Sequence, residues 1–201
     1  PVDQNRKGEQ IEMGNVSWED AKAKSGELIA GALPFDAQSE EDFQRKDGLY
    51  VLVYCGTQLG GSLWEEPSPR IVYVGHTGND SLRHWRNDTG ISTVRRSLAA
   101  MLATALNLQA VPRSNDPEDE DRFANYKLDE SSELVLTAWM REHLRIGFFD
   151  PAAGEREAWY QALLDYNAPM FVFQNNPQNS YGAQIKLYRM QLAEQAARSL
   201  A

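Results

Sequence analysis

Two runs of strand-forming residues, separated by a stretch rich in glycine, proline and serine, constrain the fold of this chain most strongly. Residues 48–55 read GLYVLVYC and residues 70–75 read RIVYVG. Both runs are dense in the β-branched and aromatic side chains that favour strands. The stretch GTQLGGSLWEEPSP between them is typical of a long loop. The pattern therefore predicts two strands that pair as a hairpin.

Strict alternation assigns the side chains of this hairpin to two faces. On the first strand Tyr50 shares a face with Leu52. On the second strand Tyr73 shares a face with Ile71 and Gly75. The two tyrosines then lie on one face of the sheet if the register of the hairpin pairs them.

Helical patterns precede the hairpin and fill most of the chain after it. Ser17 followed by Asp20 has the spacing of a capping box, and either Ser92 or Thr93 caps a later segment rich in alanine and leucine. The run RIGFF predicts a third strand, PMFVFQNN an extended segment, and the acidic stretch 112–121 a solvated loop. The predicted helices are 18–30, one or two turns from Ser39, Ser81 to about Asn87, VRRSLAAMLATALNL, SSELVLTAWMREHL, GEREAWYQALLDYN and about 181–200.

Charge is unevenly distributed along the chain. The net charge is -9 at pH 7, which argues against a general nucleic-acid coat protein. Residues 81–96 nevertheless carry Arg83, Arg86, Arg95 and Arg96 against a single acidic residue, Asp88. A local basic surface is therefore compatible with an acidic chain.

Neither a membrane segment nor a structural zinc site is expected. No apolar run approaches the roughly 18 residues of a membrane span, and the first residues lack the apolar core of a signal peptide. The single cysteine and three histidines are too few for a typical zinc site. Cys55, inside YVLVYC, is expected to be a buried small hydrophobic residue. We therefore expect a cytoplasmic protein.

The order of these segments resembles the GIY-YIG nuclease superfamily. Gly48-Leu49-Tyr50 stands where the first motif is expected, and Val72-Tyr73-Val74-Gly75 where the second is expected. Three later segments look like a bacterial branch of the superfamily whose helix starts with Ser-Thr-x-Arg-Arg: STVRRSL (92–98), LTAWMREHL (136–144) and EREAWYQALLDYNAPMF (155–171). The resemblance covers roughly residues 48–190.

This resemblance implies an α+β fold, in which a small antiparallel three-stranded sheet is flanked by helices. The nuclease-like domain is then expected at 48–176. An N-terminal tail and helical extension (1–47) precede it, and a C-terminal helix (177–201) packs on it.

The resemblance also implies DNA as the substrate and a divalent cation, Mg²⁺ or Mn²⁺, as the cofactor. Tyr50 is the tyrosine nearest the attacking water, as its base or its positioner, and Tyr73 helps to orient that water and the phosphate. Glu157 matches the single metal-binding glutamate better than Glu155. Gly75 is expected where the chain turns tightly and the backbone approaches substrate. A phenol, a carboxylate and an arginine suit phosphodiester hydrolysis, because they can orient water, hold a metal and neutralise developing charge.

The helix after the second motif departs from the superfamily pattern, which has a catalytic arginine three residues after a leucine and a histidine one turn later. Counting along this frame puts Trp85 at the arginine position. If Trp85 instead matches the apolar residue after the arginine, His84 takes the arginine position and Asp88 that of the later histidine. If the alignment is shifted by one residue, Arg83 or Arg86 takes the role of the catalytic arginine. A protonated His84, its pKa raised by Asp88, could partly replace the arginine.

A second departure lies near the C-terminal end of the match. A Pro-x-Asn pattern is expected there, and Pro169-Met170-Phe171 is present instead. Asn175 and Asn176 follow, but not at the expected position.

Two functions follow from these patterns. The first is a metal-dependent endonuclease of bacterial type, with Arg86, Arg95, Arg96 and His76 as nucleic-acid-binding residues. The second is a catalytically impaired domain that binds nucleic acid or a protein partner, with Trp64 as a candidate anchor for a protein.

Overall fold

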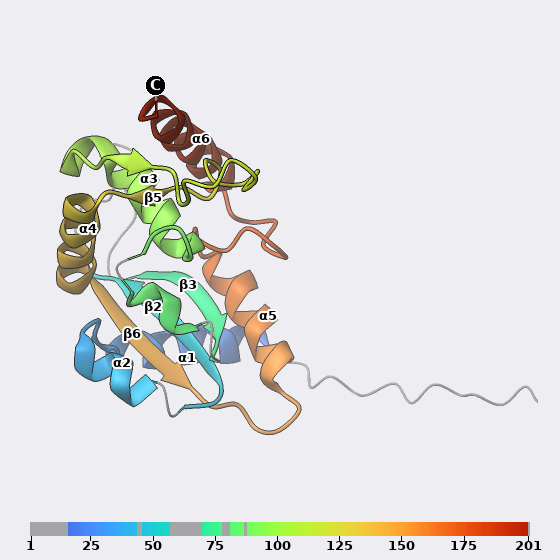
Figure 1. Ribbon diagram of the computed structural model, residues 1–201. Helices are drawn as coiled ribbons and strands as arrows, with labels where there is room; N and C mark the ends of the chain where they lie inside the picture. The colour runs from blue at the N-terminus through green and yellow to red at the C-terminus, as the bar shows by residue number, and fades with distance from the viewer. Residues whose placement is uncertain (1–15, 44–45, 57–69, 78–80, 87, 201) are drawn as a thin grey trace, which may run out of the picture.

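The computed structural model describes residues 16–43, 46–56, 70–77, 81–86 and 88–200. Its centre is a four-stranded antiparallel sheet with strand order β1-β6-β2-β3 (Figure 1). A two-stranded sheet, β4-β5, lies apart from it. The strands are β1 (Leu33–Pro34), β2 (Leu49–Tyr54), β3 (Arg70–His76), β4 (Ala110–Val111), β5 (Lys127–Leu128) and β6 (Leu144–Phe149).

The three predicted strands of the central sheet are confirmed as β2, β3 and β6, and the α+β class with them. Strand β1 adds a fourth strand that the sequence did not predict. Only Leu33 and Pro34 form it, both paired with β6. Two residues are too few for an alternating pattern, and a proline does not indicate a strand.

Helices account for most of the rest of the described chain. The capping box of Ser17 and Asp20 is present, and Ser92 rather than Thr93 caps the helix that follows the second motif. Asp129 caps the next one. The helices are α1 (Trp18–Ala30), α2 (Ala37–Phe43), the 3-10 helix η2 (Ser81–His84), α3 (Thr93–Leu106), α4 (Glu130–His143), α5 (Arg156–Asn167) and α6 (Gly182–Arg198).

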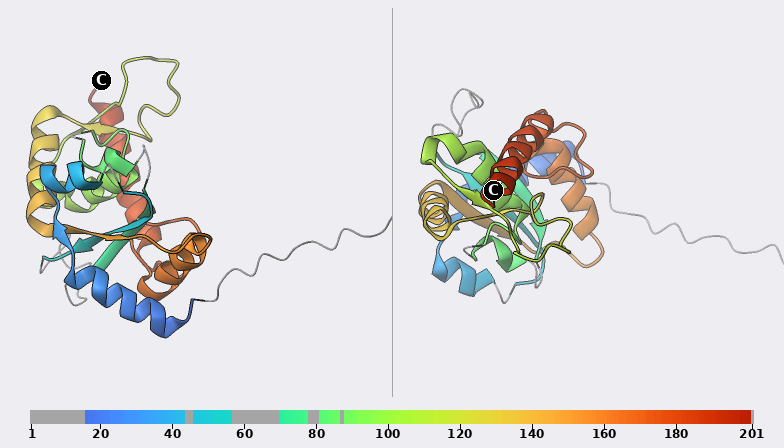
Figure 2. Two further views of the ribbon diagram at one scale, coloured as in Figure 1. Left: turned by 90° about the horizontal axis from the view of Figure 1, so that it is seen from below. Right: turned by 45° about the horizontal axis from the view of Figure 1, so that its top comes forward.

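Each face of the sheet is covered by its own set of helices. Helices α1 and α5 cover one face, where Leu28, Leu163 and Leu164 pack on Val51 and Val53 (Figure 2). The larger core lies on the other face, beneath α2, α3, α4 and α6. Because β3 is an edge strand of the sheet, residues on it can contact elements from both layers.

A β-bulge in β3 changes the predicted faces of the hairpin. Leu52 pairs with Tyr73 and Val53 with Ile71, so Val72 is the extra residue. Ile71 therefore packs with Val53 on the α1/α5 side, and the prediction that it shares a face with Tyr73 is wrong. Beyond the bulge, Tyr50 pairs with Gly75 and lies on the same face as Tyr73, as the pattern predicted.

Other local predictions are corrected. Cys55 follows the last residue of β2 and is exposed rather than buried. The segment PMFVFQNN forms turns and bends instead of an extended segment. No helix among the described residues is long and apolar enough to cross a membrane.

Candidate active site

Tyr50 lies in the interior, at the start of β2. Its side chain is 1% exposed, beneath Phe43 of α2, whose ring centroid is 4.9 Å away. The hydroxyl is 2.8 Å from Nε2 of His84. Burial, followed by the neighbouring Tyr73, raises the pKa of Tyr50 well above its ordinary value. A phenol in this environment is neutral and acts by hydrogen bonding.

His84, the last residue of η2, is held between two hydroxyl groups. Its Nδ1 lies 2.8 Å from Oγ of Ser92 and its Nε2 faces Tyr50, and the imidazole is fully buried. Burial, and then the charges of Arg83 and Arg95, lower the pKa of His84 to about 3. The expectation of a protonated His84 is therefore wrong: Asp88 does not raise this pKa, and the ring is neutral at physiological pH.

Tyr73 and Arg83 lie at the more open side of this cluster. The ring of Tyr73 is 5.6 Å from that of Tyr50 and 5.3 Å from that of His84, and the residue is partly exposed. Arg83 is also partly exposed, and its charge lowers the pKa of His84 and opposes the rise at Tyr50. Its Nε has no hydrogen-bond partner within the described part of the chain. Arg86 is exposed.

Gly75 makes room for the two tyrosines. A Cβ on this residue would stand 2.7 Å from ring carbons of both Tyr50 and Tyr73. Gly75 lies within β3 rather than at a turn, so the expected reason for this glycine is corrected. It is needed because the aromatic rings occupy the space of a side chain.

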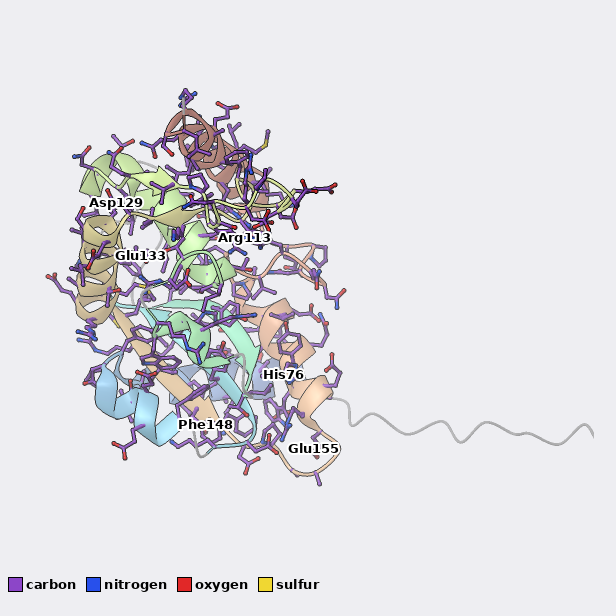
Figure 3. All side chains as sticks on the ribbon, viewed as in Figure 1. His76, Arg113, Asp129, Glu133, Phe148 and Glu155 are labelled. Atoms are coloured by element: carbon purple, nitrogen blue, oxygen red, sulfur yellow. The ribbon has the colours of Figure 1, made fainter. Side chains whose placement is uncertain are left out.

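His76 and Glu157 meet at the end of β3, on the other face of the sheet. Nε2 of His76 is 3.9 Å from a carboxylate oxygen of Glu157, in the first turn of α5, and its ring lies 4.6 Å from Tyr160. Figure 3 shows His76 beside α5, well apart from Glu133 on α4. Burial, and then the charges of Tyr73 and Glu157, raise the pKa of Tyr160. Tyr160 was not singled out from the sequence. It contacts His76, and its pKa responds to both Tyr73 and Glu157.

Glu157 fits a divalent cation that the substrate helps to bind. The side chain is 65% exposed, and a carboxylate oxygen lies 3.9 Å from Nε2 of His76. No group of three or more histidine, cysteine or acidic side chains in the described ranges could hold a metal alone. Magnesium commonly uses one or two carboxylates, water and substrate phosphate. A single exposed glutamate is compatible with that mode.

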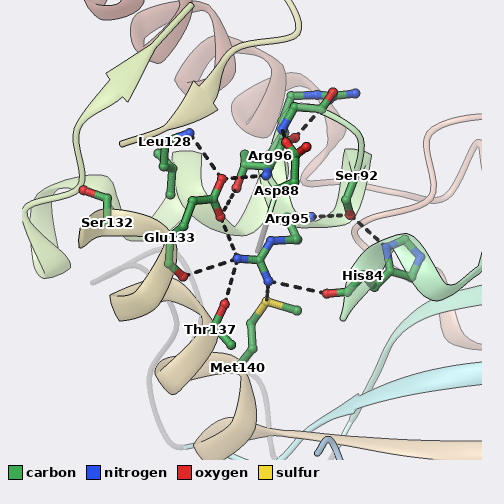
Figure 4. A network of polar contacts seen from close by, with 12 residues as sticks. His84, Asp88, Ser92, Arg95, Arg96, Leu128, Ser132, Glu133, Thr137 and Met140 are labelled. Atoms are coloured by element: carbon green, nitrogen blue, oxygen red, sulfur yellow. Dashed lines mark hydrogen bonds and ion pairs between the residues drawn. The ribbon is translucent and has the colours of Figure 1, made fainter. Parts of the chain in front are cut away.

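Arg95 and Arg96 are buried, contrary to the expectation that they bind nucleic acid. Arg95 is 0% exposed and donates to Oε2 of Glu133 at 2.7 Å (Figure 4). Arg96 is 7% exposed and donates to the carbonyls of Thr89 and Gly90. Their place in the first turn of α3 points them into the protein. Basic side chains with these partners do not form a surface for phosphates.

Trp85, which one alignment of the motif puts at the expected arginine position, has a structural role. Its ring stacks on Phe35 at 4.6 Å and lies 5.1 Å from Phe43, and its indole N–H donates to the carbonyl of Asp36. These partners all belong to the N-terminal extension. The tryptophan therefore anchors that extension over Tyr50.

The residues at the expected Pro-x-Asn pattern also have structural roles. Phe171 is buried, and its backbone N–H donates to the carbonyl of Val72 in the bulge. The side-chain amide of Asn176 donates to the carbonyls of Pro169 and Val172 and fixes the turn after α5. Trp64 lies outside the described residues.

Comparison with protein families matches residues 57–191 to the family described as GIY-YIG catalytic domain. The match covers more than half of the chain and includes β3, η2 and the helices from α3 to the start of α6, whereas β2 with Tyr50 precedes it. Comparisons with curated proteins and with solved structures gave no significant match. The matched range and the antiparallel α+β architecture together show that the chain belongs to the GIY-YIG family of nuclease-type domains.

Proposed function

We propose that the protein is an endonuclease that hydrolyses DNA phosphodiester bonds with Mg²⁺ or Mn²⁺. This proposal rests on the side chains that cluster around the end of β3. Tyr50, Tyr73 and His84 pack with ring centroids 5.3–6.1 Å apart, and His76, on the same strand as Tyr73, lies 3.9 Å from Glu157 of α5. Phenols, an arginine and an exposed carboxylate are the groups that this reaction requires.

In this proposal Tyr73 contacts the attacking water and Tyr50 positions Tyr73. Tyr73 is the more exposed phenol, whereas Tyr50 is neutral and bound to His84. If Nδ1–H of His84 donates to Ser92, its Nε2 accepts from the hydroxyl of Tyr50, whose oxygen remains free to accept a hydrogen bond from the hydroxyl of Tyr73. The oxygen of Tyr73 can then accept a hydrogen bond from water.

Arg83 stabilises the negative charge that develops on the phosphate. Its charge lowers the pKa of His84 and opposes the rise in the pKa of Tyr50, and its buried Nε has no hydrogen-bond partner among the described residues. Glu157 would hold the cation, which supplies Lewis-acid activation of a phosphate oxygen when bound. His76, beside that carboxylate, limits its side-chain freedom.

A cleavage assay with and without metal tests the proposal. Duplex, single-stranded and branched DNA are incubated with the protein in Mg²⁺, in Mn²⁺ or in chelator. We expect metal-dependent nicking or cleavage that Tyr50→Phe reduces strongly, because the variant keeps the ring and loses the hydroxyl that bonds His84. Tyr166→Phe is the matched control, since Tyr166 packs against Trp18 away from this cluster. A folded wild-type protein that cleaves no substrate with either metal would refute the enzymatic function.

The burial of Tyr50 favours a second function, a domain that binds DNA without cutting it. Phe43, which is itself packed on Trp85, closes over Tyr50 and keeps its phenol away from substrate. In that case duplex binding persists without cleavage, and its affinity falls steeply with salt. Binding that does not respond to salt would instead indicate a protein partner.

A further inference from the structure

A buried polar network joins α4 to the segment that carries His84. The carboxylate of Glu133, 5% exposed, accepts four hydrogen bonds. The donors are the backbone N–H and hydroxyl of Thr89, the backbone N–H of Leu128 and the guanidinium of Arg95 (Figure 4). The carboxylate therefore has little freedom to reorient.

Arg95 extends this network to the backbone of His84. One terminal nitrogen donates to Glu133 and, at 2.9 Å, to the hydroxyl of Thr137. The other donates to the carbonyl oxygen of His84 at 3.4 Å and faces the sulfur of Met140. The guanidinium thus connects α3 and α4 to the end of η2.

A second branch reaches the imidazole of His84. Glu133 fixes Thr89, and Ser92 ends the same short turn. Oγ of Ser92 accepts from the backbone N–H of Arg95 and lies 2.8 Å from Nδ1 of His84. Both ends of His84, its carbonyl and its ring, are therefore tied to elements that Glu133 and Arg95 hold.

We infer that Glu133 and Arg95 are positioning residues, which fix the His84 ring and through it the hydroxyl of Tyr50. The inference rests on the proposed function for its catalytic consequence. A buried ion pair contributes little net stability, because desolvation offsets much of the attraction. Its directed hydrogen bonds do fix geometry, and a displacement near 1 Å at a reacting group can cost on the order of 100-fold in rate. The orientation of the His84 ring can be measured without an activity assay.

The test separates orientation from stability by comparing single and double variants. Glu133→Gln leaves the charge of Arg95 unpaired and should lower both Tm and kcat. The double variant Glu133→Leu with Arg95→Met removes both charges and should recover part of the Tm lost in Glu133→Gln, although the N–H groups of Thr89 and Leu128 lose their acceptor. It lacks the bonds to Thr89 and His84. We expect its kcat to remain about 10- to 100-fold low with KM nearly unchanged.

Imidazole nitrogen NMR shifts provide the readout that does not depend on cleavage. The chain has three histidines, so the His84 signals can be assigned with single variants of the other two. We expect one tautomer with both ring nitrogens hydrogen-bonded in wild type, and averaged tautomer shifts in the double variant. Leu192→Ala, in the contact of α6 with α3, is the stability control and should leave the His84 shifts unchanged.

Arg95→Lys sharpens the test, because an ammonium can retain the ion pair without the bond to the His84 carbonyl. We expect an intermediate shift change and an intermediate kcat. If the double variant regains Tm, wild-type His84 shifts and wild-type kcat together, the pair is only structural and the inference is overturned. If wild type does not cleave but its His84 shifts respond as expected, the positioning holds and the proposed enzymatic function fails.

Discussion

The two ends of the candidate active site differ in how their polar groups are satisfied. At the interior end His84 is fully buried between two hydroxyls, and Glu133 accepts four hydrogen bonds. At the open end the side chains of His76 and Glu157 are 42% and 65% exposed and only 3.9 Å apart at their closest. The interior end can hold fixed geometry, whereas the open end leaves the carboxylate of Glu157 accessible, as the proposed cation site requires. Strand β3 contributes to both ends, because the side chains of Tyr73 and His76 point to opposite faces of the sheet.

The open end provides the largest expected effect. We predict that Glu157→Gln lowers cleavage by on the order of 1000-fold, about 4 kcal/mol, because the metal loses its protein carboxylate. The free energy of unfolding should change by less than about 0.5 kcal/mol, since the side chain is exposed. Rates in Mg²⁺ and a urea titration measure the two quantities.

Glu155→Gln is the control for this change. Glu155 precedes α5 and is also exposed, so its variant should cleave at nearly the wild-type rate. A larger loss in Glu155→Gln than in Glu157→Gln would move the metal site to the other carboxylate.

The boundary between the two ends provides the next effect. We predict that Arg83→Ala lowers kcat by about 100-fold, near 2.7 kcal/mol, as expected for loss of one donor to developing charge. Arg86→Ala should chiefly weaken DNA binding, because Arg86 is exposed and Arg83 is the arginine whose charge acts on Tyr50. Single-turnover rates and binding titrations distinguish them. Equal losses of kcat would contradict the assignment of the catalytic arginine to Arg83.

The interior end provides the smallest effect, a dependence of stability on pH. The folded pKa of His84 is about 3, below its ordinary value near 6.5. Between these values the unfolded chain binds a proton that the folded protein does not. Stability is therefore unaffected above pH 6.5 and falls as the pH drops towards 3. We predict a loss of about 2 kcal/mol between pH 7.5 and pH 5 from His84.

Urea unfolding of wild type and His84→Gln across this range measures the effect. The variant is less stable at neutral pH, so the comparison is between the slopes with pH and not between absolute values. The wild-type curve should fall more steeply. Parallel curves would show that folding does not change the pKa of His84 and would contradict the prediction.

The local part of the fold was predictable because it depends on neighbours in sequence. The capping box at Ser17, the cap at Ser92 and the strands β2, β3 and β6 involve contacts within a few residues or a simple alternation. The bulge at Val72 was not predictable, since it leaves the composition of the strand unchanged and appears only in its pairing with β2.

The sequence indicated which residues belong to the candidate site better than it indicated their burial and protonation. Tyr50, Tyr73, His84 and Arg83 were chosen from motif order, and the structure brings them together. Tyr160 was missed because a tyrosine on an amphipathic helix gives no signal of its own. Trp85 was noticed because it departs from the superfamily pattern. Its stacking on Phe35 was not predictable, because the two residues are 50 positions apart in the chain.

By itself the sequence determined an α+β chain of the GIY-YIG type, with an arginine-bearing segment after its second strand and an acid on a later helix. Only the tertiary structure decided which of those arginines face solvent. Arg95 and Arg83 look equivalent in sequence, but Arg95 meets Glu133 across 38 positions and is buried, whereas Arg83 stays partly exposed. The physical reason is that local spacing fixes backbone hydrogen bonds and side-chain faces, while burial and charge partners depend on helices that pack together from distant parts of the chain.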